Sequence, residues 1–209
     1  MNKLNAALIT NLLKKEYPAA ECSLRYKKPH ELLIATRLAA QCTDARVNMV
    51  TPELFARYTC PRDFAEAELT ELEGYIASCG LFHTKAADII EMCRRLTDVY
   101  GGNVPDTMEE LLTLRGVGRK TANLILGDVY GKPAVVTDTH CIRISNRLGL
   151  AASKEPRKVE DALRECIAPE EQNDFCHRLV LHGRAVCTAR SPKCGECALS
   201  GVCEKNGIK

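Results

Sequence analysis

Aromatic residues are scarce in this 209-residue chain: it has no tryptophan, and Phe, Trp and Tyr together make up 5% of it. So few rings argue against a surface that stacks the bases of single-stranded nucleic acid. Long hydrophobic runs are missing too, because the longest stretch without Asp, Glu, Lys or Arg, Gly74 to Thr84, has eleven residues. A membrane-spanning helix needs about 20 apolar residues, so we expect no membrane segment.

Cysteine, by contrast, is abundant, with 12 residues. The N-terminus has neither the apolar run nor the small-residue cleavage site of a secretory signal, which favours a reducing, cytoplasmic compartment. In such a compartment cysteines are more often buried apolar residues, metal ligands or catalytic groups than disulfides. The formal charge is only +2, from 29 Lys and Arg against 27 Asp and Glu, and by itself it indicates no partner.

Apolar residues recur at helical spacing through almost the whole chain. One apolar face follows residues 86–100 until Gly101 and Gly102 end it, and another follows residues 159–167. Residues 134–136 are the only strand candidate. The sequence therefore predicts an all-α fold of about ten short helices, in one or two domains.

Three local signals refine the expected helix boundaries. Thr107 with Glu110 three residues later forms a capping box, and Thr84 can cap a helix that begins at Lys85. Pro52 either restarts a helix or kinks one, and the sequence does not decide between them.

Basic residues are concentrated in two segments of this nearly neutral chain. Residues 115–147 hold six bases and two acids, and so do residues 178–209. If the two segments share one face of the folded protein, they form a basic surface. Otherwise they are ordinary solvated helix faces, and the charge counts alone favour this second interpretation.

A glycine turn, Gly116-Val117-Gly118, separates a capped helix from a second helix that begins near Gly118. Two glycines around one apolar residue let the backbone turn tightly and bring its N–H groups, with the positive helix end, against a phosphate. An αα-hairpin with an ordinary C-cap glycine is the alternative. Lys120 follows in the first turn, beside Arg119, where positive potential disfavours the ammonium form and so favours an amine nucleophile.

Four cysteines at the C-terminus have the spacing C-x6-C-x2-C-x5-C: Cys187, Cys194, Cys197 and Cys203. Four thiolates this close together in a polar loop indicate a metal site. Structural zinc usually uses two close cysteine pairs, and only Cys194 and Cys197 form one, so the spacing suits a [4Fe–4S] cluster as well or better. The other eight cysteines, Cys93 and Cys166 among them, are expected to be reduced and mostly buried.

Several short motifs follow one another along nearly the whole chain. They are Ala39-Ala40-Gln41-Cys42-Thr43-Asp44, Gly80-Leu81, residues 114–122 around the glycine turn, Asp138-Thr139-His140, Leu181-His182-Gly183-Arg184 and the cysteine cluster. Together they resemble the endonuclease III family of helix-hairpin-helix DNA glycosylases. Matching in order, they are far more specific than any one motif.

The resemblance implies a bifunctional enzyme of DNA base-excision repair. It would be an N-glycosylase for oxidised or damaged pyrimidines and an abasic-site lyase that cleaves 3′ to the site by β-elimination. Lys120 would attack C1′ and form a Schiff base, with Asp138 as its electrostatic partner. Without the resemblance, the simpler interpretation of Asp138 is the N-cap of the following helix. The cofactor implied is a [4Fe–4S] cluster with a structural role.

The resemblance also implies a set of DNA-binding residues. Gln41 and Leu81 would fill the gap left by a flipped nucleotide, while on residue type alone they are a polar helix-end residue and a core leucine. The full set is Gln41, Leu81, Gly116, Val117, Gly118, Arg119, His140, Arg184, Arg190 and Lys193.

Two helical lobes are implied as well. Residues 22–132 would form a six-helix barrel with the helix-hairpin-helix at about 107–129, and residues 1–21 with 133–209 would form a lobe containing the cluster loop, 187–203. The expected partner is double-stranded DNA with damaged bases or abasic sites, bound by a monomer in the cytoplasm, at the nucleoid, with no membrane involved.

Three positions depart from the family pattern. Arg115 stands where proline is usual, Thr137 where valine is usual and Ala39 where serine is common. The first adds a charge beside the glycine turn, and the other two change polarity near the expected pocket. The resemblance therefore implies the reaction type more firmly than the range of bases.

Two other functions match parts of the pattern. A monofunctional glycosylase of the adenine-DNA branch would share the cluster, but it lacks a lysine at position 120 and has a further C-terminal domain, whereas this chain stops six residues after Cys203. A non-catalytic, cluster-bearing module that binds DNA or senses redox state is the second alternative.

Overall fold

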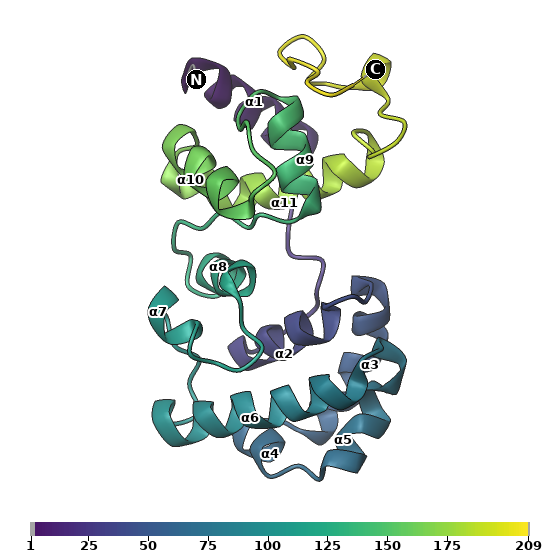
Figure 1. The fold of residues 1–209 in the computed structure, drawn as a ribbon, viewed down its shortest axis with the longest axis vertical. Coiled ribbons are helices and arrows are strands. Elements are labelled where there is room, and N and C mark those ends of the chain that lie inside the picture. Colours follow the sequence, from purple (N-terminus) through teal and green to yellow (C-terminus); the bar gives the residue numbers. More distant parts are fainter. Residues whose placement is uncertain (1–2, 209) are drawn as a thin grey trace. The chain divides into compact units, whose positions relative to one another are not determined.

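The computed structural model describes residues 3–208, and all regular structure in that range is helical (Figure 1). The α-helices are α1 (Lys3–Glu16), α2 (Pro29–Ala39), α3 (Asp44–Arg57), α4 (Pro61–Ala65), α5 (Leu69–Ile76), α6 (Phe82–Tyr100), α7 (Met108–Leu111), α8 (Arg119–Asp128), α9 (Thr139–Arg147), α10 (Pro156–Cys166) and α11 (Gln172–Ala185). Single 3-10 turns are η1 (Ala77–Cys79), η2 (Pro169–Glu171) and η3 (Cys194–Glu196). The predicted all-α fold is confirmed.

The chain divides into two compact units. One spans Ser23–Tyr130 and contains α2 to α8. The other combines the residues up to Cys22 with those from Gly131 onward, so it contains α1 together with α9 to α11.

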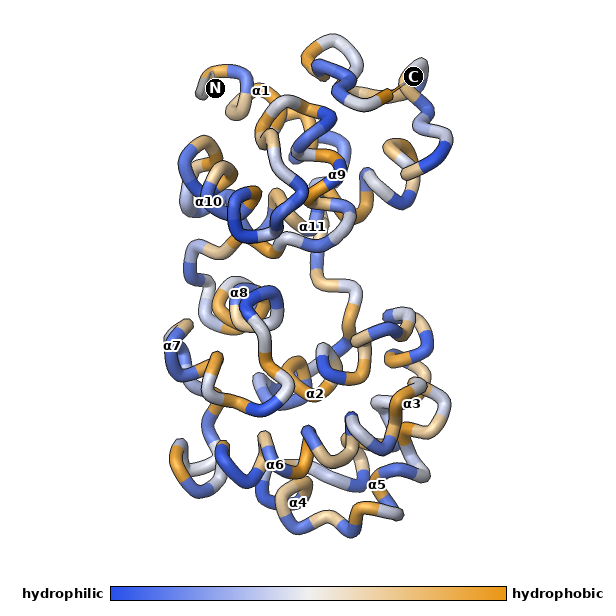
Figure 2. The backbone as a smooth tube through the Cα atoms, viewed as in Figure 1, coloured by the Kyte–Doolittle hydropathy of each residue, from blue (hydrophilic) through white to orange (hydrophobic). Residues whose placement is uncertain are grey.

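Helix α6 is the centre of the Ser23–Tyr130 unit. It packs against α2, α4 and α5, and its buried face includes Ile89, Cys93 and Leu96. It ends at Gly101, whose positive φ of 60° closes the helix as the sequence predicted. In Figure 2, apolar and hydrophilic residues alternate around α6, as expected of a helix with one face in a core.

The start of α6 differs from the sequence prediction. Leu81, not Thr84, is the N-cap residue, and the helix begins at Phe82. The left-handed backbone of Gly80 and Leu81 ends the preceding turn η1, so the new helix starts at once and Thr84 lies inside it. A capping side chain gives only a local preference, and the preceding turn overrode it.

Two other expected boundaries have clear outcomes. Thr107 caps α7, because its side chain accepts a hydrogen bond from the amide of Glu110 at 3.3 Å, as the capping box predicted. Pro52 lies inside α3, so it does not restart a helix.

The other unit packs α1 against α10 and α11, and α9 against the same two helices. The strand candidate at residues 134–136 is a buried connection without strand pairing in the described chain. The amide of Val136 donates to the sulfur of Cys176 at 3.3 Å. This apolar segment leads from the boundary at Gly131 directly into the start of α9.

The eight cysteines outside the C-terminal cluster are free thiols, and four of them are buried, fewer than expected. Cys79, Cys93, Cys141 and Cys176 are buried, whereas Cys22, Cys42, Cys60 and Cys166 are half-buried. Burial raises the pKa of Cys93 well above its usual value, so this thiol is a neutral apolar group. Cys166 is the last residue of α10, where the core no longer covers it.

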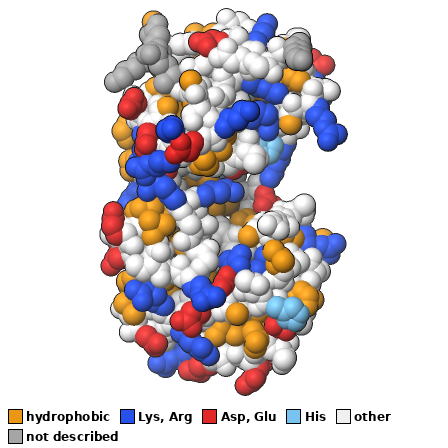
Figure 3. Space-filling model, in the orientation of Figure 1, with side chains coloured by type: hydrophobic (Ala, Val, Ile, Leu, Met, Phe, Trp, Pro, Cys, Tyr) orange, Lys and Arg blue, Asp and Glu red, His pale blue; other side chains and the backbone are white. Residues whose placement is uncertain are grey.

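Part of the charge in the two basic segments lies inside the fold. In residues 115–147, Arg147 is buried and Arg143 is half-buried, and both donate to main-chain carbonyls. In residues 178–209, Arg178 is buried and paired with two acidic neighbours. The sequence counts therefore overstate the exposed basic surface, although Lys and Arg side chains remain on both units on the face drawn in Figure 3.

Among the described residues, none of the helices combines the length and the apolar character needed to cross a bilayer.

Candidate active site

The glycine turn lies between α7 and α8, as predicted, but its two glycines differ in backbone conformation and in the space around them. Gly116 has a φ of 76°, and a Cβ there would lie 2.8 Å from Cδ of Arg37. Gly118 is the N-cap of α8 with an extended backbone (φ −100°, ψ 175°), and a Cβ there would meet nothing within 4 Å. Only Gly116 is therefore required by the turn itself, and Gly118 leaves open space at the start of α8.

Lys120 is the second residue of α8 and is exposed. No side chain caps this helix through Gly118, so the first-turn amides of α8 keep the anion-binding character of a helix N-terminus. Val117 is 9% exposed, and its amide donates to the carbonyl of Leu114 at 3.1 Å, which holds the turn against the core. Arg119 is half-buried beside it.

Side chains of α2 and α6 form a charged network with Arg115 that supports the hairpin. Asp88 of α6 accepts from Nε of Arg115 at 2.7 Å and from Nε of Arg37 at 2.9 Å. Burial opposes ionisation of Asp88, but the hydrogen bonds from Arg115 and Arg37 hold its pKa below the ordinary value. The extra charge of Arg115 is thus compensated within the fold.

Gln41 and Leu81 share an uncommon backbone conformation. Their φ angles are 56° and 49°, in the left-handed region that residues with a Cβ rarely adopt. Such a conformation costs about 1–3 kcal/mol at each residue and persists only where the surrounding structure imposes it. Leu81 is 58% exposed, so it is not a core leucine. Gln41 is also exposed, two residues beyond the end of α2.

Asp138, in the other unit, is the N-cap of α9. Its Oδ1 accepts from the amide of Cys141 at 2.7 Å, and the residue is half-buried. The N-cap interpretation of Asp138 is therefore confirmed as a structural role. His140 lies in the first turn of the same helix, where a Cβ on Gly183 of α11 would come within 2.3 Å of its Nδ1. Gly183 thus lets α9 and α11 pack closely.

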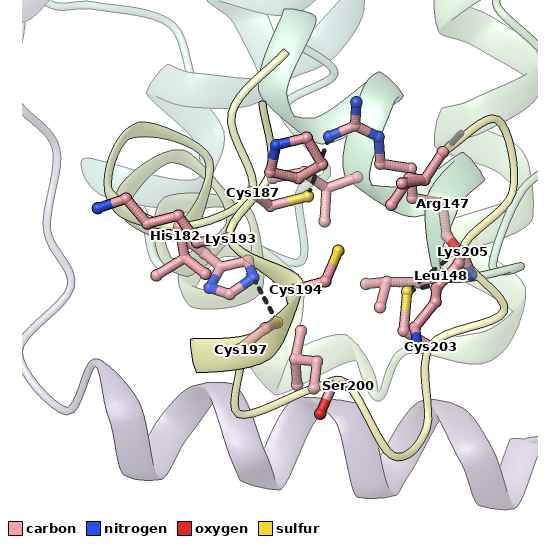
Figure 4. A pocket seen from close by; sticks show the side chains of 15 residues that line it. Arg147, Leu148, His182, Cys187, Lys193, Cys194, Cys197, Ser200, Cys203 and Lys205 are labelled. Atoms are coloured by element: carbon pink, nitrogen blue, oxygen red, sulfur yellow. Dashed lines mark hydrogen bonds between the residues drawn. The ribbon is translucent and has the colours of Figure 1, made fainter. Parts of the chain in front are cut away.

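The four C-terminal cysteines line one cavity, and Figure 4 shows their sulfurs around a common hollow. The same cavity is lined by Arg147 and His182. Nη1 of Arg147 donates to the sulfur of Cys187 at 3.2 Å, and the amide of Lys205 donates to that of Cys203 at 3.3 Å. Hydrogen bonds to sulfur are typical of the surroundings of thiolate ligands.

His182 connects this cavity to α1. Its Nδ1 lies 3.1 Å from the hydroxyl of Tyr17, and its Nε2 lies 3.5 Å from the sulfur of Cys197. Burial lowers the pKa of His182, which favours the neutral ring. In the tautomer that suits a thiolate, Nε2–H donates to Cys197 and Nδ1 accepts from Tyr17.

These residues fit an iron–sulfur cluster. Four thiols from one loop face a shared hollow, no two of them form a disulfide, and N–H donors point at their sulfurs. Four cysteine thiolates are the usual ligands of a [4Fe–4S] cluster.

The remaining residues of the expected DNA-binding set lie at the surface. Arg184, at the end of α11, is exposed, and so are Arg190 and Lys193 of the cysteine loop. Of the whole set, the structure brings together the four hairpin residues, while Gln41 and Leu81 each follow a helical segment, α2 and η1, whose last-turn carbonyls bind the ammonium of Lys85. Lys120 and Asp138 belong to different units.

Sequence reasoning missed the residues that support this site from inside. They are Lys85 and Asp88 on α6, Arg143 and Arg147 on α9, and His182 on α11. Charged residues on apolar helix faces, at 85 and 88, were the available signal, because a buried charge needs a specific partner. Their partners are distant in sequence, so the pattern could not identify them.

Comparison with known proteins gives consistent matches over nearly the full chain. Residues 34–169 match the family model "HhH-GPD superfamily base excision DNA repair protein", and residues 187–203 match that of the iron-sulfur binding domain of endonuclease III. The chain is 48% identical over 202 residues to Endonuclease III of Synechocystis sp., covering 96% of this chain and 92% of the relative. It is 39% identical over 204 residues to Endonuclease III of Escherichia coli strain K12, covering 98% and 97%.

Solved structures give the same picture. The fold matches a trapped covalent intermediate of endonuclease III with DNA at a TM-score of 0.92 and 42% identity, covering 98% of this chain and 97% of that one. A thermostable thymine-DNA glycosylase matches at a TM-score of 0.87 and 23% identity, covering 96% of each chain, which shows a shared fold only. The expected helix-hairpin-helix glycosylase fold is confirmed.

Proposed function

Because the chain belongs to the endonuclease III family of helix-hairpin-helix base-excision DNA repair proteins, we propose that Lys120 and Asp138 carry its reaction on the deoxyribose. The protein is a bifunctional DNA glycosylase and abasic-site lyase, and it carries a [4Fe–4S] cluster. The proposal concerns the role of each residue in that reaction. The single observation that carries the assignment of Lys120 is an exposed amine in the first turn of the helix that follows the hairpin.

In the proposed reaction, the neutral amine of Lys120 forms a bond to C1′ while the bond from C1′ to the damaged base breaks. The base leaves with the electron pair and takes up a proton. The Lys120 nitrogen then passes one proton to O4′ as the bond from C1′ to O4′ breaks, which opens the sugar ring and leaves a protonated imine between Lys120 and C1′. Loss of a C2′ proton sends its electrons toward the imine and expels the phosphate on C3′, which cuts the strand on the 3′ side.

Asp138 is proposed to stabilise the positive charge that forms during this reaction. Positive charge develops on the deoxyribose as the base leaves, and a carboxylate nearby stabilises it. Asp138 is held in place by its hydrogen bond to the amide of Cys141, which fixes the direction of the carboxylate. The N-cap bond and the catalytic role are compatible because a carboxylate has several acceptor positions.

Gln41 and Leu81 are proposed to fill the duplex after the nucleotide has flipped out. Exposure of an apolar side chain on a strained turn has no stabilising effect on the free protein, but it presents a side chain that can enter a base stack. Filling the gap offsets part of the cost of unstacking.

Contacts with the phosphate backbone of the DNA are proposed to come from both units of the protein. The hairpin, Gly116 to Arg119, would bind a phosphate through its amides, and the open space at Gly118 allows that close approach. His140, Arg184, Arg190 and Lys193 would add contacts from the cluster unit. Binding through phosphates should weaken steeply as salt concentration rises.

Cys187, Cys194, Cys197 and Cys203 would hold the cluster, which supplies a rigid centre for the loop between them. Arg147 orders that loop by donating to the carbonyls of Thr188 and Ala189, at 2.7 and 3.0 Å. The proposed reaction transfers no electrons, so the loop is needed for its shape and for the basic side chains it presents.

Substrate range and working state are further parts of the proposal. Oxidised or ring-damaged pyrimidines in double-stranded DNA are the proposed substrates, and a panel of duplexes with single defined lesions tests this. Because the enzyme acts on DNA, we propose that it works in the cytoplasm, at the nucleoid. We propose a monomer, which light scattering with and without DNA checks.

Borohydride trapping on DNA with an abasic site tests the central assignment, because reduction of the imine leaves a permanent link between protein and DNA. The wild type should give an adduct, and Lys120→Ala should give none while still binding. Lys154→Ala, which removes an exposed lysine elsewhere, is the matched control and should trap like the wild type. Base release from a lesion duplex, without any wild-type adduct on abasic-site DNA, would indicate a monofunctional glycosylase, and binding without either would indicate a non-catalytic module.

A further inference from the structure

Lys85, in the first turn of α6, is completely buried. Its ammonium donates to two main-chain carbonyls, those of Leu38 at 2.7 Å and Cys79 at 2.8 Å. Burial lowers the pKa of Lys85, because the interior disfavours the charged form. A buried ammonium is costly unless it is well hydrogen-bonded, so its place between these two carbonyls calls for a specific role.

The two carbonyls end two separate helical segments. Leu38 is in the last turn of α2. At this helix end the amide of Cys42 donates to the carbonyl of Ala39, and the ammonium of Lys85 donates to the carbonyl of Leu38. Cys79 is the last residue of η1. Carbonyls at a helix C-terminus have no partner within the helix and carry the negative end of its dipole, so they suit a cation.

One intervening residue separates the end of each segment from one of the two strained, exposed residues. Gln41 follows the end of α2, and Leu81 follows η1 after one glycine. The main-chain amide of Lys85 also donates to the carbonyl of Leu81, at 3.0 Å. Lys85 therefore holds the chain on both sides of Gly80 and, through Leu38, the helix end that leads to Gln41.

The carbonyls, and not a thiolate, are the partners of this ammonium. The side chains of Cys42, Cys79 and Arg37 are the titratable groups that face it. Burial, with the neighbouring Cys42, raises the pKa of Cys79 to about 11, so this thiol is neutral at physiological pH. A tetrahedral ammonium on a long stem can reach carbonyls from two segments at once, which a planar or shorter side chain does less well.

We propose that Lys85 is a positioning residue that holds Gln41 and Leu81 in a fixed relation, so that both enter the DNA duplex together when a nucleotide is flipped out. The inference rests on the proposed function, which assigns the gap-filling work to those two residues. Lys85 itself touches neither substrate nor reacting atoms. Its effect is confined to substrates that have a base stack to open.

The test compares Lys85→Met with the wild type on one abasic-site oligonucleotide, presented as a duplex and as a single strand. Methionine keeps the buried volume and removes the ammonium. On the duplex, kcat/KM should fall about tenfold or more, because small misplacements of positioning groups have effects of that size. On the single strand it should change less than about twofold, since no gap needs to be filled.

A second buried cation supplies the matched control. Arg178 in the other unit is 2% exposed and bonds to Glu171 and Asp174 at 2.8 Å. Arg178→Met should lower the melting temperature without changing the ratio of duplex to single-strand activity. A general loss of stability therefore cannot imitate the expected result for Lys85→Met.

A double-mutant cycle asks whether Lys85 acts through the gap-filling residues. In a background with Gln41→Ala and Leu81→Ala, Lys85→Met should have little further effect on the duplex. The same fold-loss in both backgrounds would overturn the proposal. So would equal losses on duplex and single strand, or no loss on the duplex.

Folding of the variants is also decisive. If Lys85→Met does not fold, Lys85→Gln, which keeps two N–H donors on a shorter side chain, is measured in the same way. Failure of both to fold would assign the ammonium to the stability of the whole unit and refute the positioning role. If the wild type forms no borohydride adduct on either substrate, the proposed function fails instead, whatever Lys85 does.

Discussion

Arg115 and Asp88 are joined by a hydrogen bond of 2.7 Å from Nε to Oδ1, immediately below the turn at Gly116. Arg37 binds the other carboxylate oxygen, with its Nη2 at 2.6 Å, so one acid is shared by two guanidinium groups. A side chain that departs from the family pattern at position 115 has thereby become part of the support of the hairpin.

Asp88→Asn should therefore destabilise the protein. It leaves two guanidinium groups without their countercharge at a side chain that is only 10% exposed. We expect the free energy of unfolding to fall by about 1–3 kcal/mol, measured by urea denaturation. Arg115→Ala should have a smaller effect, because its side chain is 62% exposed. The reverse order would show that Arg37 alone satisfies Asp88.

The two hairpin glycines should respond differently to alanine. Gly116→Ala forces a Cβ into a left-handed residue and against Arg37, and should cost about 1–3 kcal/mol of stability. Gly118→Ala should cost at most about 1 kcal/mol of stability, because alanine is a poorer N-cap than glycine, but it should weaken binding to a duplex with an uncleavable abasic-site analogue, measured by fluorescence anisotropy. Unchanged affinity in Gly118→Ala would show that no phosphate approaches this residue closely.

Leu81→Asn should raise stability and lower activity. Asparagine tolerates the left-handed backbone better than leucine, so the free energy of unfolding should rise by about 1 kcal/mol. Cleavage of a duplex with an abasic site should become slower, because an apolar side chain no longer enters the stack. A variant that is more stable and equally active would argue against the gap-filling role.

Arg147→Met should reduce the iron content per chain. The change removes the donors to the sulfur of Cys187 and to the carbonyls of Thr188 and Ala189, which order the first part of the cysteine loop. Iron is measured by a colorimetric assay on freshly purified protein. Arg190→Met, an exposed position on the same loop, is the control and should retain its iron.

Stability should also fall in mild acid because of His30. This residue is 6% exposed, and burial lowers its pKa below the ordinary value of 6.5. A base with a lowered pKa in the folded state binds protons more readily when unfolded. Its contribution to stability is therefore complete above about pH 6.5 and is lost as the pH falls toward its folded value. His30→Gln should flatten that part of the curve of unfolding free energy against pH; parallel curves would exclude His30 as the cause.

Local signals were sufficient where one turn of chain decides the structure. The capping box at Thr107, the end of α6 at Gly101 and the N-cap at Asp138 are present as predicted, because each depends on residues within a few positions. Thr84 failed as a cap because the left-handed turn before it started the helix earlier. Backbone conformation at Leu81 has no signature in residue type.

For the candidate site, the sequence by itself determined which chemical groups are available. The lysine after the hairpin, the aspartate at a helix start and the four closely spaced cysteines are visible as residue types at fixed spacing. Only the tertiary structure decided what supports them. Lys85 and its hydrogen-bond partner Leu38 are 47 residues apart, and the group that accepts the bond is a main-chain carbonyl, which every residue possesses. Such a contact leaves no pattern in the sequence, because it arises when distant helix ends are brought together by packing of their apolar faces.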